Sequence, residues 1–210
     1  MRYNFLTIEG NIGSGKTTLS QKLSKVYDTQ LLLEKFADNP FLPKFYKKPE
    51  RYAFPLELFF MAERYSQIKE QVQGRDLFGQ KLISDYMFSK SLLFAGVTLE
   101  EQKYKLYRKL FSIILPSLPQ ADLCIYLWND IDQLIRNIRK RGRSYEQEIE
   151  KDYLLKIQKA YLSYFKNHYN GKYLILDISE RDFVGKEADF QKIIQLLEDP
   201  GLKFNQFISL

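Results

Sequence analysis

The feature that most constrains this chain is a glycine-rich segment near its start, residues 10–18, which reads G-N-I-G-S-G-K-T-T. It matches the phosphate-binding pattern G-x-x-x-x-G-K-S/T in full. The apolar run 3–8 before it is typical of a short buried strand, and residues 19–23 after it have helical spacing. Strand, glycine loop and helix in this order place backbone NH groups at the positive end of a helix, where phosphate binds. The sequence therefore predicts that the chain binds a nucleoside triphosphate.

The positions of this segment have distinct expected roles. Lys16 should reach the terminal phosphates, and Thr17 should offer its hydroxyl to Mg²⁺. Glycine adopts backbone angles that other residues avoid, so the loop can curl around phosphate oxygens. The expected ATP-binding residues of the loop are Gly10, Asn11, Ile12, Gly13, Ser14, Gly15, Lys16, Thr17 and Thr18.

Chain length and apolar pattern limit the possible architecture. The 210 residues suffice for one well-packed α/β domain and are few for two, so we expect a single domain over residues 1–210. No apolar run approaches the roughly 20 residues that cross a bilayer. Residues 1–4 lead directly into the first expected strand and leave no room for a signal peptide. We therefore expect a cytoplasmic protein.

Composition excludes several kinds of chemistry. Cys124 and His168 are the only residues of their types, which excludes disulfides within the chain, zinc clusters and Cys/His catalysis. The net charge of +6 suits a nucleic-acid-binding protein and equally suits an enzyme that holds polyphosphates. Charge alone does not separate these two classes.

Apolar runs and helical repeats alternate along the chain, which predicts a parallel sheet of five strands with helices on both faces. The segment 50–73 is apolar on nearly every side of its first half, which indicates a buried helix that Pro55 kinks or delays. Thr98 and Glu101 have the spacing of a capping box. The tail 200–210 carries no readable pattern. The expected strands are 3–8, 30–34, 81–85, 123–127 and 173–176. One expected helix follows the phosphate loop, and a short one begins within 38–43. The other expected helices span 50–73, 86–94, 98–115, 130–140, 146–167 and 190–197.

Three broad functions share the phosphate loop: GTP-driven switches, ATP-driven motors or nucleic-acid enzymes, and small-molecule kinases. A switch needs a guanine-reading NKxD motif, which is absent, and residues 76–79 match D-x-x-G only after a polar segment. A motor usually carries a strand that ends in Asp-Glu, whereas the strand 81–85 ends in a lone acid. These comparisons favour a kinase.

A kinase needs an acid near the acceptor hydroxyl and Mg²⁺ held by the loop hydroxyl and a strand-end carboxylate. Glu34 and Asp85 end two expected strands, at the sheet edge where ligands bind in such folds. We assign Glu34 as general base and Asp85, with Thr17, to the metal. The alternative for both acids is an ordinary helix cap or a surface carboxylate.

Beyond the loop, the chain resembles the deoxyribonucleoside kinase family, and it looks closest to the bacterial deoxyadenosine/deoxyguanosine branch. The resemblance covers nearly the whole length. It is carried by residues 8–18, by Leu33 and Glu34, by residues 46–54 (Y-K-K-P-E-R-Y-A-F), by Arg141, Gly142 and Arg143, and by Asp182 and Phe183.

The resemblance implies a five-stranded P-loop kinase fold, a homodimer formed through helices and an arginine-rich lid over ATP. Its catalytic glutamate falls on Glu34. Its glutamate-arginine-serine motif falls on residues 85–87, so Tyr86 stands where the family often has an arginine that touches the transferring phosphates. We expect the lid to supply the missing charge.

The lid would span residues 136–147. Arg141 and Arg143 match the family pattern, whereas Asn137 stands where a further arginine is common, and Arg136 or Arg139 could substitute for it. The alternative for this basic cluster is a nucleic-acid patch, which the lack of interleaved aromatic residues disfavours. The expected lid cations are Arg136, Arg139, Lys140, Arg141 and Arg143.

The resemblance also assigns the acceptor site. Tyr46 and Glu146 fall on positions that bind the sugar 3'-hydroxyl, and a phenol with a carboxylate can both donate to and accept from one hydroxyl. Asp182 and Phe183 match a loop beside the adenine of ATP, where Phe183 could stack. These two are the least specific of the assigned residues.

Glu57 and Arg64 fall on the family's two base-reading positions, seven residues apart and so on one face of the buried helix. The alternative is that they form an ion pair. The family has glutamine where this chain has Glu57, and an ionised glutamate only accepts hydrogen bonds. Guanine offers two adjacent donors, so we expect deoxyguanosine to be preferred and deoxyadenosine to come next.

These readings converge on ATP- and Mg²⁺-dependent phosphorylation of a purine deoxyribonucleoside at its 5'-hydroxyl, for nucleotide salvage. Two alternatives stay open at this point: a thymidylate-type nucleoside monophosphate kinase, and a non-catalytic nucleotide- or nucleic-acid-binding protein. A deoxynucleoside triphosphate that fills both substrate sites could act as a feedback inhibitor. No membrane or nucleic-acid partner is expected.

Overall fold

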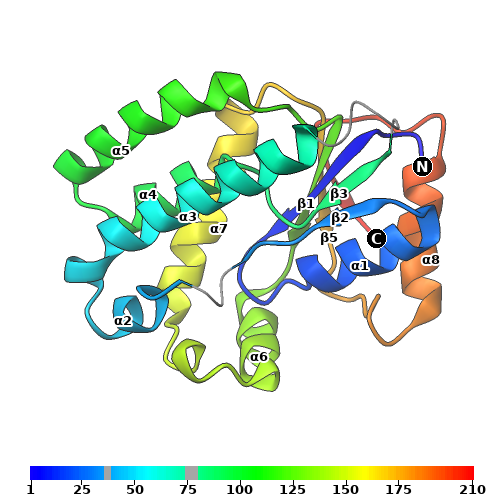
Figure 1. Cartoon of the computed structure of the whole chain (residues 1–210). Coiled ribbons are helices and arrows are strands. Elements are labelled where there is room, and N and C mark those ends of the chain that lie inside the picture. Colours follow the sequence, from blue (N-terminus) through cyan, green and yellow to red (C-terminus); the bar gives the residue numbers. More distant parts are fainter. Residues whose placement is uncertain (36–38, 74–79) are drawn as a thin grey trace.

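The computed structural model describes the chain except for residues 36–38 and 74–79 (Figure 1). Its centre is a parallel sheet with the strand order β2-β3-β1-β4-β5-β6. The predicted α/β class and parallel sheet are therefore confirmed. The strands are β1 (Phe5–Gly10), β2 (Gln30–Leu32), β3 (Leu82–Ser84), β4 (Leu123–Trp128), β5 (Tyr173–Asp177) and β6 (Gln206–Ser209).

Helices cover both faces of the sheet, and Figure 1 shows α1 and α8 on one side and α3, α4, α5 and α7 on the other. Two short 3₁₀ segments, Leu115–Ser117 and Ser144–Glu146, connect neighbouring elements. The helices are α1 (Lys16–Tyr27), α2 (Leu42–Lys47), α3 (Pro49–Gln73), α4 (Lys90–Thr98), α5 (Glu101–Ile114), α6 (Ile131–Arg141), α7 (Lys151–Asn167) and α8 (Glu187–Glu198). None of the described helices is long and apolar enough to cross a membrane.

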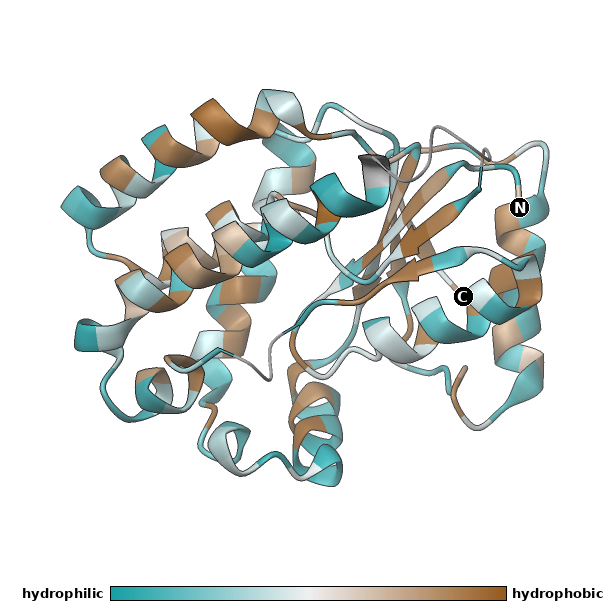
Figure 2. Cartoon of the chain, viewed as in Figure 1, coloured by the Kyte–Doolittle hydropathy of each residue, from teal (hydrophilic) through white to brown (hydrophobic). Residues whose placement is uncertain are grey.

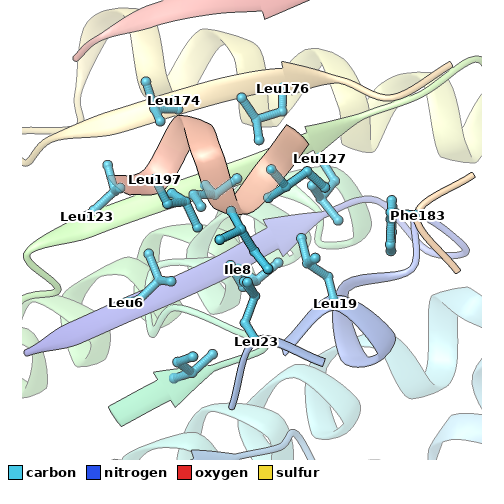
Figure 3. Packing of buried hydrophobic residues seen from close by; sticks show 14 of the residues in the cluster. Leu6, Ile8, Leu19, Leu23, Leu123, Leu127, Leu174, Leu176, Phe183 and Leu197 are labelled. Atoms are coloured by element: carbon cyan, nitrogen blue, oxygen red, sulfur yellow. The ribbon is translucent and has the colours of Figure 1, made fainter. Parts of the chain in front are cut away.

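The two faces of β4 show how the sequence builds a two-sided core. Leu123, Ile125 and Leu127 pack toward α1 and α8, whereas Cys124 and Tyr126 pack toward α4 and α7. Successive side chains of a strand point to opposite faces, so a continuous apolar run is buried on both sides. Figure 3 shows the α1 and α8 side of this core, and Figure 2 shows that the apolar residues concentrate in the sheet and on the inner helix faces.

The described sheet has six strands where the sequence analysis expected five. The sixth, β6, lies in the tail and pairs in parallel with β5, with Leu174 opposite Gln206 and Asp177 opposite Ser209. It is an edge strand on which Ile208 packs against the core and Phe207 is half-exposed. A four-residue strand whose side chains are half-buried or exposed gives a weak period-two signal, which is why the sequence did not reveal it.

Two expected helix starts are wrong. Residues 86–89 precede α4 because Met87 N donates to Glu9 Oε1 and the Ser84 hydroxyl donates to Tyr86 O, which holds the segment in a turn. Glu146 ends the 3₁₀ segment Ser144–Glu146, and a turn and two irregular residues separate it from the start of α7 at Lys151.

The expected capping box is also wrong. The Thr98 hydroxyl lies near Glu57 and Phe94 instead of capping α5, and the cap residue Glu100 makes no side-chain capping bond. Asp38, expected to cap the helical piece that became α2, and the D-x-x-G match at 76–79 lie outside the described residues.

Candidate active site

The phosphate loop connects β1 to α1, as predicted. Gly13 and Gly15 have φ angles of 83° and 87°, in the left-handed region that other residues rarely adopt. A Cβ atom on Gly13 would lie 2.8 Å from Leu134 O, and one on Gly15 would lie 2.9 Å from the ring of Phe183. The loop is therefore held closely between α6 and the segment after β5.

Lys16 begins α1 and its Nζ donates to Asn11 O at 2.9 Å. Asn11 is itself fixed, because its Nδ2 donates to Leu154 O on α7 at 2.8 Å. Burial, together with the positive charge of Lys90, lowers the pKa of Lys16 to about 8. Lys16 is partly buried in the loop, and the nearby carboxylates of Glu9, Glu34 and Asp85 offset part of its charge.

Asp85 connects the loop to the second predicted acid. Its Oδ2 accepts a hydrogen bond from the Thr17 hydroxyl at 2.5 Å, and its Oδ1 accepts one from the backbone NH of Glu34 at 2.8 Å. Because β2 pairs with β3 and β3 with β1, the carboxyl ends of these strands meet at one edge. The structure thus brings the assigned residues Thr17, Asp85 and Glu34 together.

Glu34 is held by two cations. Its Oε1 accepts hydrogen bonds from Arg64 Nε and Nη2 at 2.7 and 2.6 Å, and its Oε2 accepts one from Lys90 Nζ at 2.5 Å. Burial raises the pKa of Glu34, but the charges and hydrogen bonds of Lys90 and Arg64 outweigh burial and hold it at about 2. Glu34 is therefore a carboxylate at neutral pH.

Tyr86, which stands at the family's arginine position, does not reach the site. Its side chain is fully buried, and its hydroxyl donates to Gln67 Oε1 at 2.9 Å. Lys90, four residues later, supplies a cation that the sequence analysis missed. A lysine within the apolar and serine-containing run 88–94 was the available signal.

The sugar-site residues of the sequence analysis lie together at the end of α2 and in the 3₁₀ segment Ser144–Glu146. Glu146 is buried and accepts hydrogen bonds from Arg141 Nη2 and, at 3.2 Å, from Arg143 Nη1. Tyr46 stacks on Tyr145 with ring centroids 6.3 Å apart. Burial and then the Glu146 charge raise the pKa of Tyr46, so its hydroxyl stays a proton donor.

Only part of the predicted lid faces this site. Arg141 and Arg143 line the cavity, whereas Arg136 and Arg139 are exposed on α6 and are not among its described lining residues. Arg136 donates to Gln133 Oε1 at 2.6 Å. Instead of an arginine contact, Asn137 Nδ2 donates to Gly13 O at 2.8 Å, which fixes the loop to α6.

Glu57 has no cation partner in the described part of the chain. The proposed ion pair with Arg64 is not formed, because Arg64 binds Glu34 and the Ser91 hydroxyl. Glu57 Oε1 lies 3.1 Å from Thr98 Oγ1, while Oε2 is buried without a hydrogen-bond partner among the described residues. Burial raises the pKa of Glu57 to about 7 against the opposing charge of Arg64.

Thr98 offers Glu57 only a shared hydrogen bond. Thr98 Oγ1 lies 2.9 Å from Phe94 O as well as 3.1 Å from Glu57 Oε1. A hydroxyl carries one hydrogen and both neighbours are acceptors when Glu57 is ionised. The Thr98 hydroxyl can therefore donate to only one of these two acceptors at a time.

Phe183 and Asp182 occupy a different environment from the one expected. The Phe183 ring is 3% exposed and packs under Gly15 in the core on the α1 side of the sheet (Figure 3). The expectation that it stacks on adenine is therefore corrected, because most of its surface is already covered. Asp182 accepts a hydrogen bond from Gly185 N at 2.9 Å and shapes the same loop.

One cavity unites the remaining assigned residues, with the phosphate loop at one end and α3 at the other. The assigned residues that line it are Ile12, Lys16, Thr17, Glu34, Tyr46, Glu57, Arg64, Asp85, Arg141, Arg143 and Glu146. The further lining residues, which were not predicted from the sequence, are Leu42, Phe45, Leu56, Phe60, Lys90, Phe94 and Tyr153. Apolar walls with a few convergent polar groups are typical of a small-molecule site.

The chain is similar in sequence to known proteins. A family model described as deoxynucleoside kinase matches residues 6–199. Deoxyguanosine kinase of Bacillus subtilis is 34% identical over 193 residues, which cover 90% of this chain and 93% of that protein. Deoxyadenosine/deoxycytidine kinase of the same organism is 30% identical over 196 residues, covering 91% and 90%.

Solved structures agree with the sequence comparisons. Deoxyadenosine kinase from M. mycoides with bound dATP matches with a TM-score of 0.80 at 24% identity, over 93% of this chain and 99% of that chain. At this level of identity the match concerns the fold. The parallel sheet and its covering helices are thus shared with a solved deoxynucleoside kinase structure.

Proposed function

Because this chain belongs to the deoxynucleoside kinase family, we propose that it transfers the γ-phosphoryl group of ATP to the 5'-hydroxyl of a purine deoxyribonucleoside. The observation that carries this proposal is a single cavity that joins the phosphate loop, Glu34 and the buried Glu57. Such a cavity can hold a triphosphate at one end and a base at the other. The products would be ADP and the nucleoside 5'-monophosphate, and the role would be nucleotide salvage by a single-domain cytoplasmic enzyme.

Glu34 acts on the acceptor hydroxyl in this proposal. The transferring phosphoryl group passes through a loose transition state, so the nucleophile needs orientation more than deprotonation. Glu34 accepts a hydrogen bond from the 5'-hydroxyl and takes its proton late. Lys16, Arg141 and Arg143 line the same cavity and stabilise the charge on the phosphoryl oxygens.

Thr17 and Asp85 would hold Mg²⁺. A hydroxyl and a carboxylate are hard oxygen donors, and the 2.5 Å contact between them shows that both point to one place beside the loop. Mg²⁺ typically takes one or two protein ligands and completes its shell with water and substrate phosphates. When bound, it would neutralise charge on the β- and γ-phosphate oxygens.

Tyr46 and Glu146 would bind the sugar. Both line the cavity, and the arginines that bind Glu146 fix the position of its carboxylate. A phenol and a carboxylate that enclose the 3'-hydroxyl leave no partner for a 2'-hydroxyl, which favours deoxyribose.

Glu57 would read the base. The relatives described above act, by name, on deoxyguanosine, deoxyadenosine and deoxycytidine, so relatives do not fix the base. The unpartnered Oε2 is a buried acceptor in the cavity, which fits a donor on the base edge. We propose deoxyguanosine as the preferred acceptor and deoxyadenosine as the second.

Steady-state turnover with ATP and each of the four deoxynucleosides tests this function. We expect ADP release with deoxyguanosine and deoxyadenosine, and much less with deoxycytidine and thymidine. A preference for a pyrimidine would contradict the base assignment alone. Turnover only with nucleoside monophosphates would instead indicate the thymidylate-type alternative and overturn the proposed acceptor.

Two further properties belong to this proposal. A deoxynucleoside triphosphate would place its base at Glu57 and its phosphates in the loop, which predicts inhibition by dGTP or dATP that competes with ATP. Leu106 and Ile113 on α5 and Leu155 on α7 are exposed apolar residues, which supports a homodimer formed through helices. Light scattering of the purified protein would give its mass in solution.

A further inference from the structure

Lys90 occupies an unusual position for a cation. It is the first residue of α4, its side chain is almost fully buried, and its Nζ lies 2.5 Å from Glu34 Oε2. The amino end of a helix carries a positive partial charge, so a cation is unfavourable there. Burial of an ammonium group costs further free energy. A residue that opposes stability in two ways suggests a role in function.

Lys90 and Lys16 form a pair. Each is the first residue of its helix, α4 or α1, and both line the cavity that contains Glu34. The two charges interact, because the Lys90 charge, after burial, is the largest influence that lowers the pKa of Lys16. Two helix amino ends, one with the buried Lys90 and one with the partly buried Lys16, therefore converge on one place, which favours a multiply charged anion.

Glu34 is the carboxylate that contacts Lys90, whereas the charge of Lys16 is also offset by Glu9 and Asp85. Glu34 accepts hydrogen bonds from both Lys90 and Arg64, and each cation uses a different oxygen of its carboxyl group. The lid arginines Arg141 and Arg143 are bound to Glu146 instead. If Lys90 moves away from Glu34, the carboxylate therefore stays paired with Arg64.

We propose that Lys90 is a further catalytic residue, whose ammonium group moves from Glu34 Oε2 to an oxygen of the transferring phosphoryl group and stabilises it together with Lys16. This inference rests on the proposed kinase function. It adds on α4 a cation for the charge that Tyr86 does not supply, beside the charges of Arg141 and Arg143.

The movement of Lys90 would also make Glu34 available to the 5'-hydroxyl of the acceptor. With Lys90 on the phosphoryl group, Oε2 is free to accept the hydrogen bond of the 5'-hydroxyl, while Arg64 still holds Oε1. The 5'-oxygen then forms its bond to the γ-phosphorus as the bond from that phosphorus to the β–γ bridging oxygen breaks. The hydroxyl proton passes to Glu34, and ADP leaves with the electron pair of the broken bond.

Three substitutions test Lys90 by steady-state kinetics. Lys90→Ala should lower kcat by about 10²- to 10³-fold, the usual loss when one charge-stabilising donor is removed, with a nucleoside KM within about threefold of wild type. Lys90→Arg should retain more activity than Lys90→Ala. Lys90→Met fills the same space without a charge, so it should fold and be as inactive as Lys90→Ala.

Added alkylamines distinguish a cation in the reaction from a structural contact. Methylammonium or ethylammonium should restore part of the kcat of Lys90→Ala, but not that of Lys90→Met, whose side chain occupies the space. Lys25→Ala, which removes an exposed lysine from α1, should keep wild-type kcat and not respond to amine.

Two results would overturn the role of Lys90. One is a kcat of Lys90→Ala within threefold of wild type. The other is a loss of activity that no amine restores and that raises the nucleoside KM as much as it lowers kcat. The proposed function is tested separately, by the turnover of the wild-type protein with deoxynucleosides. The test of Lys90 compares only the kcat of each variant with the kcat of the wild type.

Discussion

Arg64 on α3 donates to Glu34 Oε1 from both Nε and Nη2, at 2.7 and 2.6 Å, across 30 positions of the sequence. The Arg64 guanidinium also lies over the ring of Phe60, 4.9 Å from its centroid, and its Nη1 donates to the Ser91 hydroxyl at 2.7 Å. A paired, planar contact of this kind fixes both orientation and position. Arg64 therefore fixes the position of Glu34 and also lines the cavity.

We expect Arg64→Lys to lower kcat for deoxyguanosine by about 10- to 100-fold, because a lysine cannot donate to Glu34 Oε1 and to the Ser91 hydroxyl from one planar group, and a small displacement of a catalytic group has an effect of this size. Steady-state kinetics with saturating ATP would measure it. A rise in nucleoside KM with unchanged kcat would show instead that Arg64 acts on the base alone.

Glu34→Gln should lower kcat by about 10²- to 10⁴-fold, the range typical of a lost general base, while ATP binding persists. The same change leaves Arg64 and Lys90 buried without a carboxylate, so the free energy of unfolding should fall by about 3 to 5 kcal/mol. Urea denaturation and nucleotide titration would measure the two effects. Glu50→Gln, at the exposed start of α3, is the control and should change neither.

Glu57 should make base preference depend on pH. Its pKa of about 7 means that it is protonated at pH 6 and ionised at pH 8. The protonated group donates and accepts, which suits adenine, whereas the ionised group only accepts, which suits guanine. The deoxyguanosine to deoxyadenosine ratio of kcat/KM should therefore rise with pH, by up to about 100-fold from pH 6 to 8 if each base binds one form.

Glu57→Gln provides the matched comparison for this pH effect. Glutamine donates and accepts at every pH, so the ratio should become constant and favour deoxyadenosine. The charges of Arg64, Glu34 and Lys90 also act on Glu57, but they remain in the variant. Competition assays with both nucleosides would give the ratio directly. A constant ratio in wild type, or a pH-dependent ratio in Glu57→Gln, would contradict the assignment.

The sequence was sufficient to predict those parts of the site in which the functional residues belong to a local motif. The phosphate loop needs glycine angles, a lysine and a hydroxyl at fixed spacing, and Asp85 and Glu34 follow short apolar runs. The parallel sheet and family membership could be predicted for the same reason. Thr17, Asp85 and Glu34 meet because strand ends share one edge of a parallel sheet.

Contacts between elements that are distant in the sequence could not be predicted from local motifs. Whether Arg64 binds Glu57 on its own helix or Glu34 on another segment depends on how α3 lies on the sheet. Lys90 was not identified from the sequence, since its burial depends on how α4 packs. The edge strand β6 forms because β5 offers free backbone groups, and its own sequence signal is weak.

Phe183 gives a prediction that separates a structural role from a role in ATP binding. The ring is buried under Gly15, so Phe183→Leu should lower the free energy of unfolding by about 1 to 3 kcal/mol and leave the KM for ATP within about twofold of wild type. Stacking on adenine would instead contribute about 1 to 3 kcal/mol to binding, and its loss would raise that KM by roughly 5- to 150-fold. Phe207→Leu on the half-exposed edge strand is the matched control and should cost less stability. A large rise in KM with unchanged stability would restore the stacking interpretation.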